Sequence, residues 1–176
     1  MVQYLACYNF SGNANDAITG RAGIVSGATL TTDRHDCPNN AYLFDGSTNR
    51  IQLPLGNITF NDSYTFSVWA YPMSLPASGN AGWVYTLGPS NGGGDHGVML
   101  NNNYFGNTGW GGYGYDISPG ALSNTAAYSE ILPTIPNWYH VVMTRQRGVT
   151  KLYINGKLIK TSPNSGKNPE FGPLLR

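Results

Sequence analysis

Aromatic and amide side chains gather between residues 80 and 116, where many glycines separate them. Aromatic rings stack on the apolar C–H faces of sugars, and Asn and Asp side chains make the polar contacts that fix hydroxyl groups. Glycine allows such a loop to approach a ligand closely. The pattern predicts a ligand-binding surface with these candidate residues: Trp110, Tyr113, Tyr115, Tyr104, Asn102 and Asp95.

The same segment also has a structural interpretation, which the sequence alone leaves open. Tyr, Asn and Gly are ordinary loop residues, so the segment would then pack on its own scaffold. Trp83 fits a core position equally well, because residues 83–87 alternate in the manner of a strand. We expect regular structure to be short between residues 101 and 129.

Carboxylate pairs that would hydrolyse a glycosidic bond are missing from the expected strands. A retaining glycosidase needs two carboxylates about 5 Å apart, which a strand supplies with acids at positions i and i+2 or i+4. The only glutamates, Glu130 and Glu170, lie in segments that also contain proline. His140 lies among apolar residues, with no nucleophile or acid near it in the sequence. We therefore expect no enzymatic activity.

The two cysteines, Cys7 and Cys37, are too few for a zinc or iron–sulfur site. They either form one disulfide, which would pin the first strand to the loop before Ala41, or they are two unrelated thiols. The cellular compartment therefore cannot be inferred from the cysteines.

Composition and charge exclude several classes of protein. The chain has 176 residues, a net charge of +1 and 11% charged residues, against roughly 25% in an average soluble protein. It therefore lacks the basic surface that binds nucleic acid. Aromatic residues, at 12%, argue against intrinsic disorder. No apolar run approaches the ~20 residues of a membrane span, so we expect no membrane insertion.

The elements that must position these residues are strands, because the dominant apolar period is two and Gly, Asn, Asp and Pro punctuate it. In residues 64–71, Phe66, Val68 and Ala70 share one face. Asn155-Gly156 between apolar runs predicts a hairpin with a type I′ turn. The main strands are expected at residues 4–10, 41–44, 50–53, 64–71, 82–87, 97–100, 138–145 and 151–159. They predict an all-β chain that forms one antiparallel β-sandwich or jelly-roll domain over residues 1–176.

Four segments point to a known family. They are residues 8–17, residues 41–51 with the pattern A-x-x-F-D-G-x-x-x-x-I, residues 64–72, and residues 138–142 followed by 152–156. In this order they resemble the opening strand and loop, a hairpin, the central tryptophan strand and the most diagnostic strand pair of laminin-G-like domains. These domains belong to the concanavalin A-like lectin and glucanase superfamily.

The resemblance also implies that the sandwich is incomplete at its C-terminal end. The family closes with a Gly-rich strand and then a strand that carries an acidic residue and pairs near the first strand. This chain ends at Arg176, before such a strand. We therefore expect that the chain is part of a larger multidomain protein and that residues 4–10 form an unpaired edge.

In similar domains, calcium often joins the first loop to an acid in the last strand. Calcium takes several carboxylate and carbonyl oxygens, and residues 13–20 offer such groups. The resemblance implies Asp16 as the first metal ligand and the Gly20 carbonyl as the second. The alternative is a solvated loop without metal. Asp45 is expected to form a turn with Gly46 rather than bind a metal.

The resemblance, the missing acid pairs and the aromatic segment together predict a non-catalytic, lectin-like module that binds carbohydrate. Its partner would be a glycan or a glycoprotein, and the protein that carries it would be extracellular or at the cell surface. One alternative is a structural or protein-interaction module of an adhesion protein or fibre. A second, less favoured alternative is an enzyme of the same superfamily that acts on glycosides.

Overall fold

The computed structural model describes residues 4–54, 63–87, 96–113, 126–162 and 174–175 of the chain. Within these residues every regular element is a β-strand and the strand pairs are antiparallel, which confirms the all-β prediction. No helix in the described part is long and apolar enough to cross a membrane.

The chain divides into two compact units. Unit 1 comprises Met1–Ile58 with Pro173–Arg176, and unit 2 comprises Thr59–Gly172. The expectation of one domain over residues 1–176 stays a prediction.

Unit 1 contains one small sheet and one hairpin. In the sheet, β4 (Arg50–Pro54) lies between β1 (Ile24–Ser26) and β13 (Leu174–Leu175). The hairpin pairs β2 (Thr29–Thr31) with β3 (Ala41–Leu43).

The prediction of a strand at residues 4–10 is wrong, because this segment lies outside every strand. Its backbone hydrogen bonds go to the following loop. The Cys7 N–H donates to the Asp16 carboxylate, and the Cys7 carbonyl accepts from the Ala17 N–H. Phe10 has a φ of 57°, which no extended strand allows. The Asp16 side chain therefore accepts a backbone hydrogen bond that a neighbouring strand would otherwise accept.

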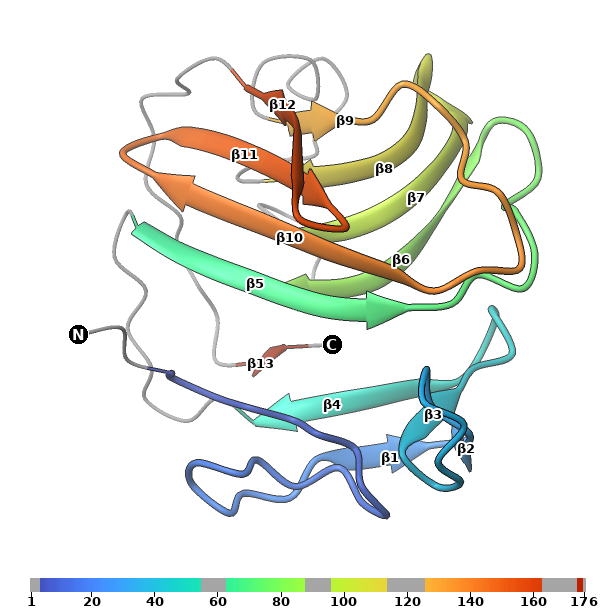
Figure 1. Ribbon diagram of the computed structural model, residues 1–176, viewed down its shortest axis with the longest axis vertical. Coiled ribbons are helices and arrows are strands. Elements are labelled where there is room, and N and C mark those ends of the chain that lie inside the picture. Colours follow the sequence, from blue (N-terminus) through green and yellow to red (C-terminus); the bar gives the residue numbers. More distant parts are fainter. Residues whose placement is uncertain (1–3, 55–62, 88–95, 114–125, 163–173, 176) are drawn as a thin grey trace. The chain divides into compact units, whose positions relative to one another are not determined.

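Unit 2 is built from two sheets (Figure 1). One sheet has the order β6-β7-β8-β9, and the other has the order β12-β11-β10-β5. Their bounds are β5 (Ser63–Ala70), β6 (Asn80–Leu87), β7 (His96–Tyr104), β8 (Asn107–Tyr113), β9 (Ala126–Tyr128), β10 (Tyr139–Gln146), β11 (Val149–Ile154) and β12 (Lys157–Thr161).

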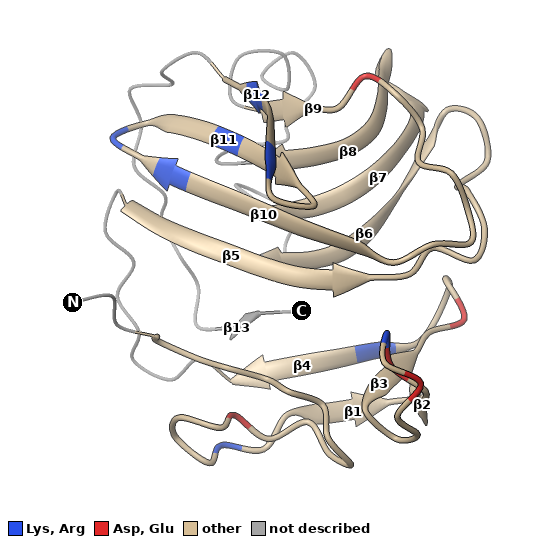
Figure 2. Cartoon of the chain, in the orientation of Figure 1, with Lys and Arg blue, Asp and Glu red and all other residues tan. Residues whose placement is uncertain are grey.

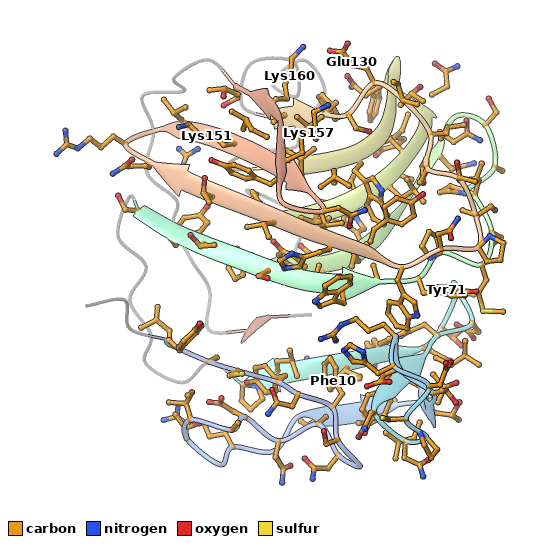
Figure 3. The ribbon with its side chains drawn as sticks, viewed as in Figure 1. Phe10, Tyr71, Glu130, Lys151, Lys157 and Lys160 are labelled. Atoms are coloured by element: carbon orange, nitrogen blue, oxygen red, sulfur yellow. The ribbon has the colours of Figure 1, made fainter. Side chains whose placement is uncertain are left out.

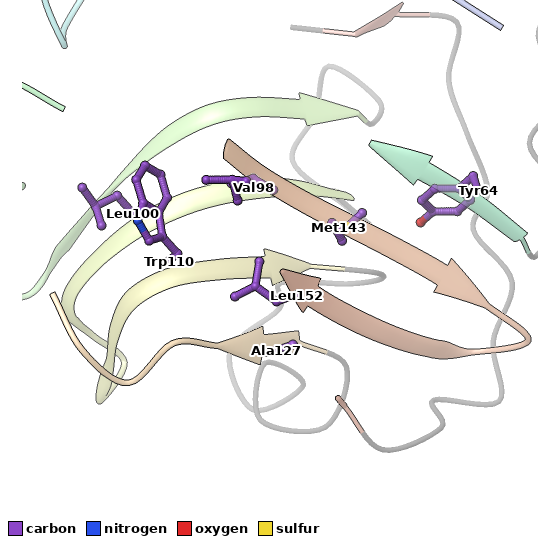
Figure 4. Close-up of a cluster of buried hydrophobic side chains, with 8 residues drawn as sticks. Tyr64, Val98, Leu100, Trp110, Ala127, Met143 and Leu152 are labelled. Atoms are coloured by element: carbon purple, nitrogen blue, oxygen red, sulfur yellow. The ribbon is translucent and has the colours of Figure 1, made fainter. Parts of the chain in front are cut away.

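The core of unit 2 takes side chains from both sheets (Figure 4). Its buried members are Tyr64, Val98, Leu100, Trp110, Ala127, Val141, Met143 and Leu152. Phe66, Val68 and Ala70 of β5 pack against this cluster, which confirms that they share the inner face. Alternate residues of β5 therefore lie on the outer face of the same sheet.

Three hairpins of unit 2 use the same two-residue turn. The turns are Phe105-Gly106, Arg147-Gly148 and Asn155-Gly156, with φ values of 47° and 78°, 48° and 80°, and 49° and 79°. Positive φ at both positions is typical of the type I′ turn, in which Asn-Gly is the preferred sequence. The hairpin predicted at Asn155-Gly156 is confirmed.

Candidate functional site

Trp110, the first residue predicted to bind a ligand, lies in the core of unit 2. It is 3% exposed, and its ring centroid is 5.6 Å from that of Tyr139. The alternation of β8 turns Trp110 toward the opposite sheet, where it joins the buried cluster. Its ring faces are therefore covered by protein, and we leave Trp110 out of the site built below.

Three other predicted residues remain without a described side-chain environment. Asp95 and Tyr115 lie outside the described residues, and Tyr113 is the last residue of β8. Their proposed contacts with a ligand stay predictions.

Asn102 and Tyr104 meet at the turn between β7 and β8. We call Asn80 and residues 102–107 the β7–β8 tip, because Asn80 pairs with Asn102 across the neighbouring strand. The Asn102 Nδ2 donates to the Pro76 carbonyl at 2.8 Å, and the Asn107 Nδ2 donates to the Phe105 carbonyl at 3.3 Å. These amides are thus held by their nitrogens, while their oxygens keep the capacity to accept from hydroxyl groups.

Phe105 is the most exposed aromatic side chain of the tip, and it is not among the residues predicted from the sequence. It is 57% exposed, and its ring centroid lies 4.5 Å from that of Tyr104, with the two ring planes at 59°. The tip therefore presents two adjacent rings beside several amides. One signal could have identified it, because Phe precedes Gly where a type I′ turn prefers Asn or Asp.

Trp83 lies on β6, on the face of the sheet opposite the core. It is 38% exposed, and it pairs with Met99 in the ladder. A Cβ atom on Gly97 would come within 3.2 Å of the Trp83 ring, so this glycine leaves room for the indole. The interpretation of Trp83 as a core residue is wrong, because Val84 and Tyr85 pack against the core instead.

Asp16 and Gly20, the predicted calcium ligands, lie in one loop of unit 1. The Asp16 carboxylate is buried and already has three donors. The Cys7 and Ile18 N–H groups donate to Oδ1 at 2.8 and 3.1 Å, and the Thr19 hydroxyl donates to Oδ2 at 2.5 Å. Burial raises the pKa of Asp16, but the hydrogen bonds from Thr19, Cys7 and Ile18 outweigh it and hold the pKa below its usual value.

This donor set is a poor fit to calcium, which takes six to eight oxygen ligands. Asp16 is one carboxylate whose lone pairs are largely engaged, and the described residues hold no cluster of three or more His, Cys, Asp or Glu suited to a metal. Calcium binding at Asp16 and Gly20 stays a prediction of the resemblance, and the hydrogen bonds that Asp16 already accepts argue against it. Asp45 forms a turn as expected, because it accepts the backbone N–H groups of residues 47–49.

His140 has a neighbour that the sequence did not reveal. The Ser67 hydroxyl lies 2.7 Å from His140 Nε2, although the two residues are 73 positions apart. The register of β5 and β10 brings them to one face of the sheet. The expectation that no nucleophile lies near His140 was therefore wrong. The pair is nevertheless exposed on the outer face of the sheet, and the His140 ring stacks on Trp69.

Cys7 and Cys37 are both free thiols in the structure. The Cys7 thiol lies 3.4 Å from Asn9 Oδ1, and the Cys37 thiol lies 3.7 Å from the His35 carbonyl. Of the two alternatives, the structure shows the unrelated thiols.

The chain belongs to the concanavalin A-like lectin/glucanases superfamily, whose laminin-G-type family model matches residues 45–175. This match confirms the resemblance to laminin-G-like domains and the sandwich fold that it implied. A sequence search of curated proteins found no significant match.

Solved structures with the same fold include two that contain a bound ligand. Domain 4 of AbnA, an extracellular GH43 arabinanase from Geobacillus stearothermophilus, solved with arabinotriose, matches with a TM-score of 0.67 and 16% identity, over 97% of this chain and 88% of that one. The binding domain of botulinum neurotoxin DC, in complex with SialylT, matches with a TM-score of 0.52 and 16% identity. The match covers 97% of this chain but only 41% of the toxin domain.

Proposed function

We propose that this chain is a non-catalytic, lectin-like module that binds carbohydrate through the β7–β8 tip. Its ligand is a glycan, free or carried by a glycoprotein. The module belongs to a larger extracellular or cell-surface protein.

The observation that carries the proposal is the exposed phenylalanine at the turn. An aromatic residue with positive φ is conformationally strained, at a cost of roughly 1–2 kcal/mol. Unit 2 holds the same turn with Asn155, a residue that tolerates this backbone well. Phe105 is not compensated by burial, because 57% of it is exposed. Strained residues often cluster at ligand-binding sites, and of the three matched turns only this one carries an aromatic ring.

The chemistry of the tip suits a sugar. The Phe105 and Tyr104 rings offer faces for apolar C–H groups, and the surrounding amides offer donors and acceptors for hydroxyl groups. The arabinanase domain, solved with arabinotriose, supports the proposal as an example of a sugar ligand on this fold. A shared fold does not establish a shared function, so the residues of the tip carry the proposal.

The decisive experiment compares wild type with Phe105→Asn in native gels that contain arabinan, xylan, galactan or mixed-linkage glucan, and on a glycan array. We expect at least one polysaccharide to retard the wild-type protein in the gel, or at least one glycan on the array to bind it. We expect Phe105→Asn to lose that binding. The same variant is expected to raise the free energy of unfolding by about 0.5–1 kcal/mol, because Asn suits the turn better.

Arg147→Asn is the matched control, because Arg147 occupies the same turn position at the other end of β10. It is expected to gain similar stability and to keep wild-type binding. If Phe105→Asn also keeps wild-type binding, the tip is not the site. If a cooperatively folded wild type binds no probe, the protein-interaction alternative replaces the lectin-like module.

Catalysis is tested separately. Oligosaccharides incubated with the protein are expected to stay intact by chromatography. Shortened products that disappear with Ser67→Ala would overturn the non-catalytic assignment.

A further inference from the structure

Four rings form a block on the outer face of the second sheet of unit 2. Trp69 of β5 pairs with His140 of β10, and Tyr71 follows β5 beside Trp138, which precedes β10. Ala70 and Tyr139, which lie between them in sequence, pack against the core. The four rings therefore point away from the core. We call Trp69, Tyr71, Trp138 and His140 the aromatic quartet.

The quartet is accessible and ordered in pairs. Trp69 is 42% exposed and Tyr71 is 41% exposed. The rings of Trp69 and His140 are stacked, with centroids 4.9 Å apart and planes at 16°. The rings of Tyr71 and Trp138 have centroids 5.2 Å apart and planes at 46°. Residues i and i+2 of a strand are about 7 Å apart, so two ring pairs follow one another along β5.

Hydrogen bonds hold the His140 side of the Trp69–His140 pair in place. The Ser67 hydroxyl lies 2.7 Å from His140 Nε2, and Asn155 exchanges hydrogen bonds of 2.8 Å with the His140 backbone. A fixed imidazole backs one face of Trp69 and restricts the indole. A preorganised aromatic surface loses little conformational entropy when a ligand binds, and this favours a higher affinity.

Among the described strands of unit 2, the two that carry the quartet, β5 and β10, contain one charged side chain, which is the buried Arg145. Strands β5 to β9 contain no Lys, Arg, Asp or Glu (Figure 2). The other basic residues of this sheet lie on β11 and β12, on the far side of β10 from β5; they are Lys151, Lys157 and Lys160 (Figure 3). Lys160 is paired with Glu130. Rings and hydroxyl groups without charges suit a neutral ligand with apolar faces and hydroxyl edges, which is the chemistry of a neutral sugar.

The quartet and the β7–β8 tip lie at the same end of unit 2. The end of β5, the start of β10 and the turn between β7 and β8 all occur there (Figure 1). The Asn102 side chain ties the loop after β5 to β7 through its bond to the Pro76 carbonyl. One ligand chain can therefore engage two aromatic surfaces, which raises affinity through effective concentration.

We propose that the aromatic quartet is a second carbohydrate contact surface and that the ligand is a neutral polysaccharide. The inference rests on the proposed function and extends it, because a polymer engages both surfaces whereas a short oligosaccharide engages one.

The test uses affinity electrophoresis of the full chain in arabinan, xylan, galactan and mixed-linkage glucan. Trp69→Thr removes the central ring but keeps a residue suited to a strand. We expect it to weaken retardation by the best polysaccharide at least about tenfold, the usual scale for truncating a tryptophan hot spot. Leu158→Thr is the matched control, because Leu158 is exposed at the other edge of this sheet. It is expected to leave retardation unchanged.

A second readout separates contact from a structural effect. The indole N–H resonance of Trp69, assigned by its absence in Trp69→Thr, is expected to shift when the best polysaccharide is added to the wild-type protein. A resonance that does not move while other signals do would overturn the quartet as a contact surface.

The outcomes distinguish the two proposals. If Phe105→Asn weakens retardation and Trp69→Thr does not, the quartet is wrong and the lectin-like function stands. If only Trp69→Thr weakens it, the quartet stands and the tip is wrong. If both do, and the trisaccharide of the same sugar competes poorly with the polymer, both stand. If no polysaccharide retards the wild-type protein, the proposal that the quartet binds a neutral polysaccharide is overturned. Binding on the glycan array then decides the lectin-like function separately.

Discussion

At the scale of single residues, Asp16 shows how one side chain can replace a strand. Its carboxylate holds Cys7, Ile18 and Thr19 in place, and it lies among the buried residues of unit 1. The resemblance to laminin-G-like domains implied a metal ligand here, since calcium binds carboxylate and carbonyl oxygens. Its donors could not be foreseen, since they depend on how the segment before the loop folds back.

Replacing Asp16 with Ala is expected to destabilise the protein by about 1–3 kcal/mol. The change leaves the Cys7 and Ile18 N–H groups and the Thr19 hydroxyl without their acceptor, and bonds to a charged group are among the stronger ones. Urea unfolding measures the loss. Asp33→Ala, in an exposed loop, is the control and is expected to cost less. Equal costs would show that the Asp16 loop has no special role.

The contribution of Asp16 also depends on pH. Its pKa in the folded protein is lowered relative to the unfolded chain, so the folded state is stabilised above the unfolded pKa of about 3.9. This stabilisation is lost as the pH falls through the lowered pKa. The stability difference between wild type and Asp16→Asn should therefore shrink below about pH 4. A difference that is constant from pH 7 to pH 2 would contradict this assignment.

At the scale of elements, the period-two pattern predicted the strands of unit 2 well. The inner face of β5 and the Asn155-Gly156 hairpin follow directly from local sequence. The pattern failed at β8, where regular structure was expected to be short but a seven-residue strand forms. Glycine weakens a strand in isolation. Here it allows close packing, because a Cβ atom on Gly112 would meet Met143 of the opposite sheet.

Gly109 gives a test of this packing. It has a φ of 84°, and a Cβ atom there would overlap Ser129 Oγ and the Ile131 carbonyl. Gly109→Ala is therefore expected to cost clearly more than the 1–2 kcal/mol of backbone strain alone. Gly156→Ala is the matched control, because Gly156 has a φ of 79° and open space around it. Equal losses of unfolding free energy in the two variants would mean that the segment with Ser129 and Ile131 moves aside at no energetic cost.

The candidate site was predicted only in part, for the same physical reason. Asn102 and Tyr104 were identified from composition and do meet at the tip. Trp110 has the same composition signal but lies in the core, because alternation along β8 decides which face each residue occupies. The pairing of Trp69 with His140 could not be predicted, since only the register of two distant strands brings the two residues together.

At the scale of the whole molecule, unfolding with and without calcium decides whether an ion is part of the fold. A ligand that binds only the folded state raises the unfolding midpoint. Because the Asp16 oxygens already accept three hydrogen bonds, we expect the same midpoint in millimolar calcium and in chelator. Differential scanning calorimetry gives the measurement. An upward shift in calcium that Asp16→Asn abolishes would establish the calcium site instead.

The three matched turns have a consequence for how this protein can change. The backbone has nearly the same φ at Phe105, Arg147 and Asn155, although each position carries a different side chain. If the tip is the binding site that we propose, a substitution at position 105 changes the recognition surface while the turn keeps its backbone geometry. A library randomised at this one position would then sample different ligand preferences on the same fold.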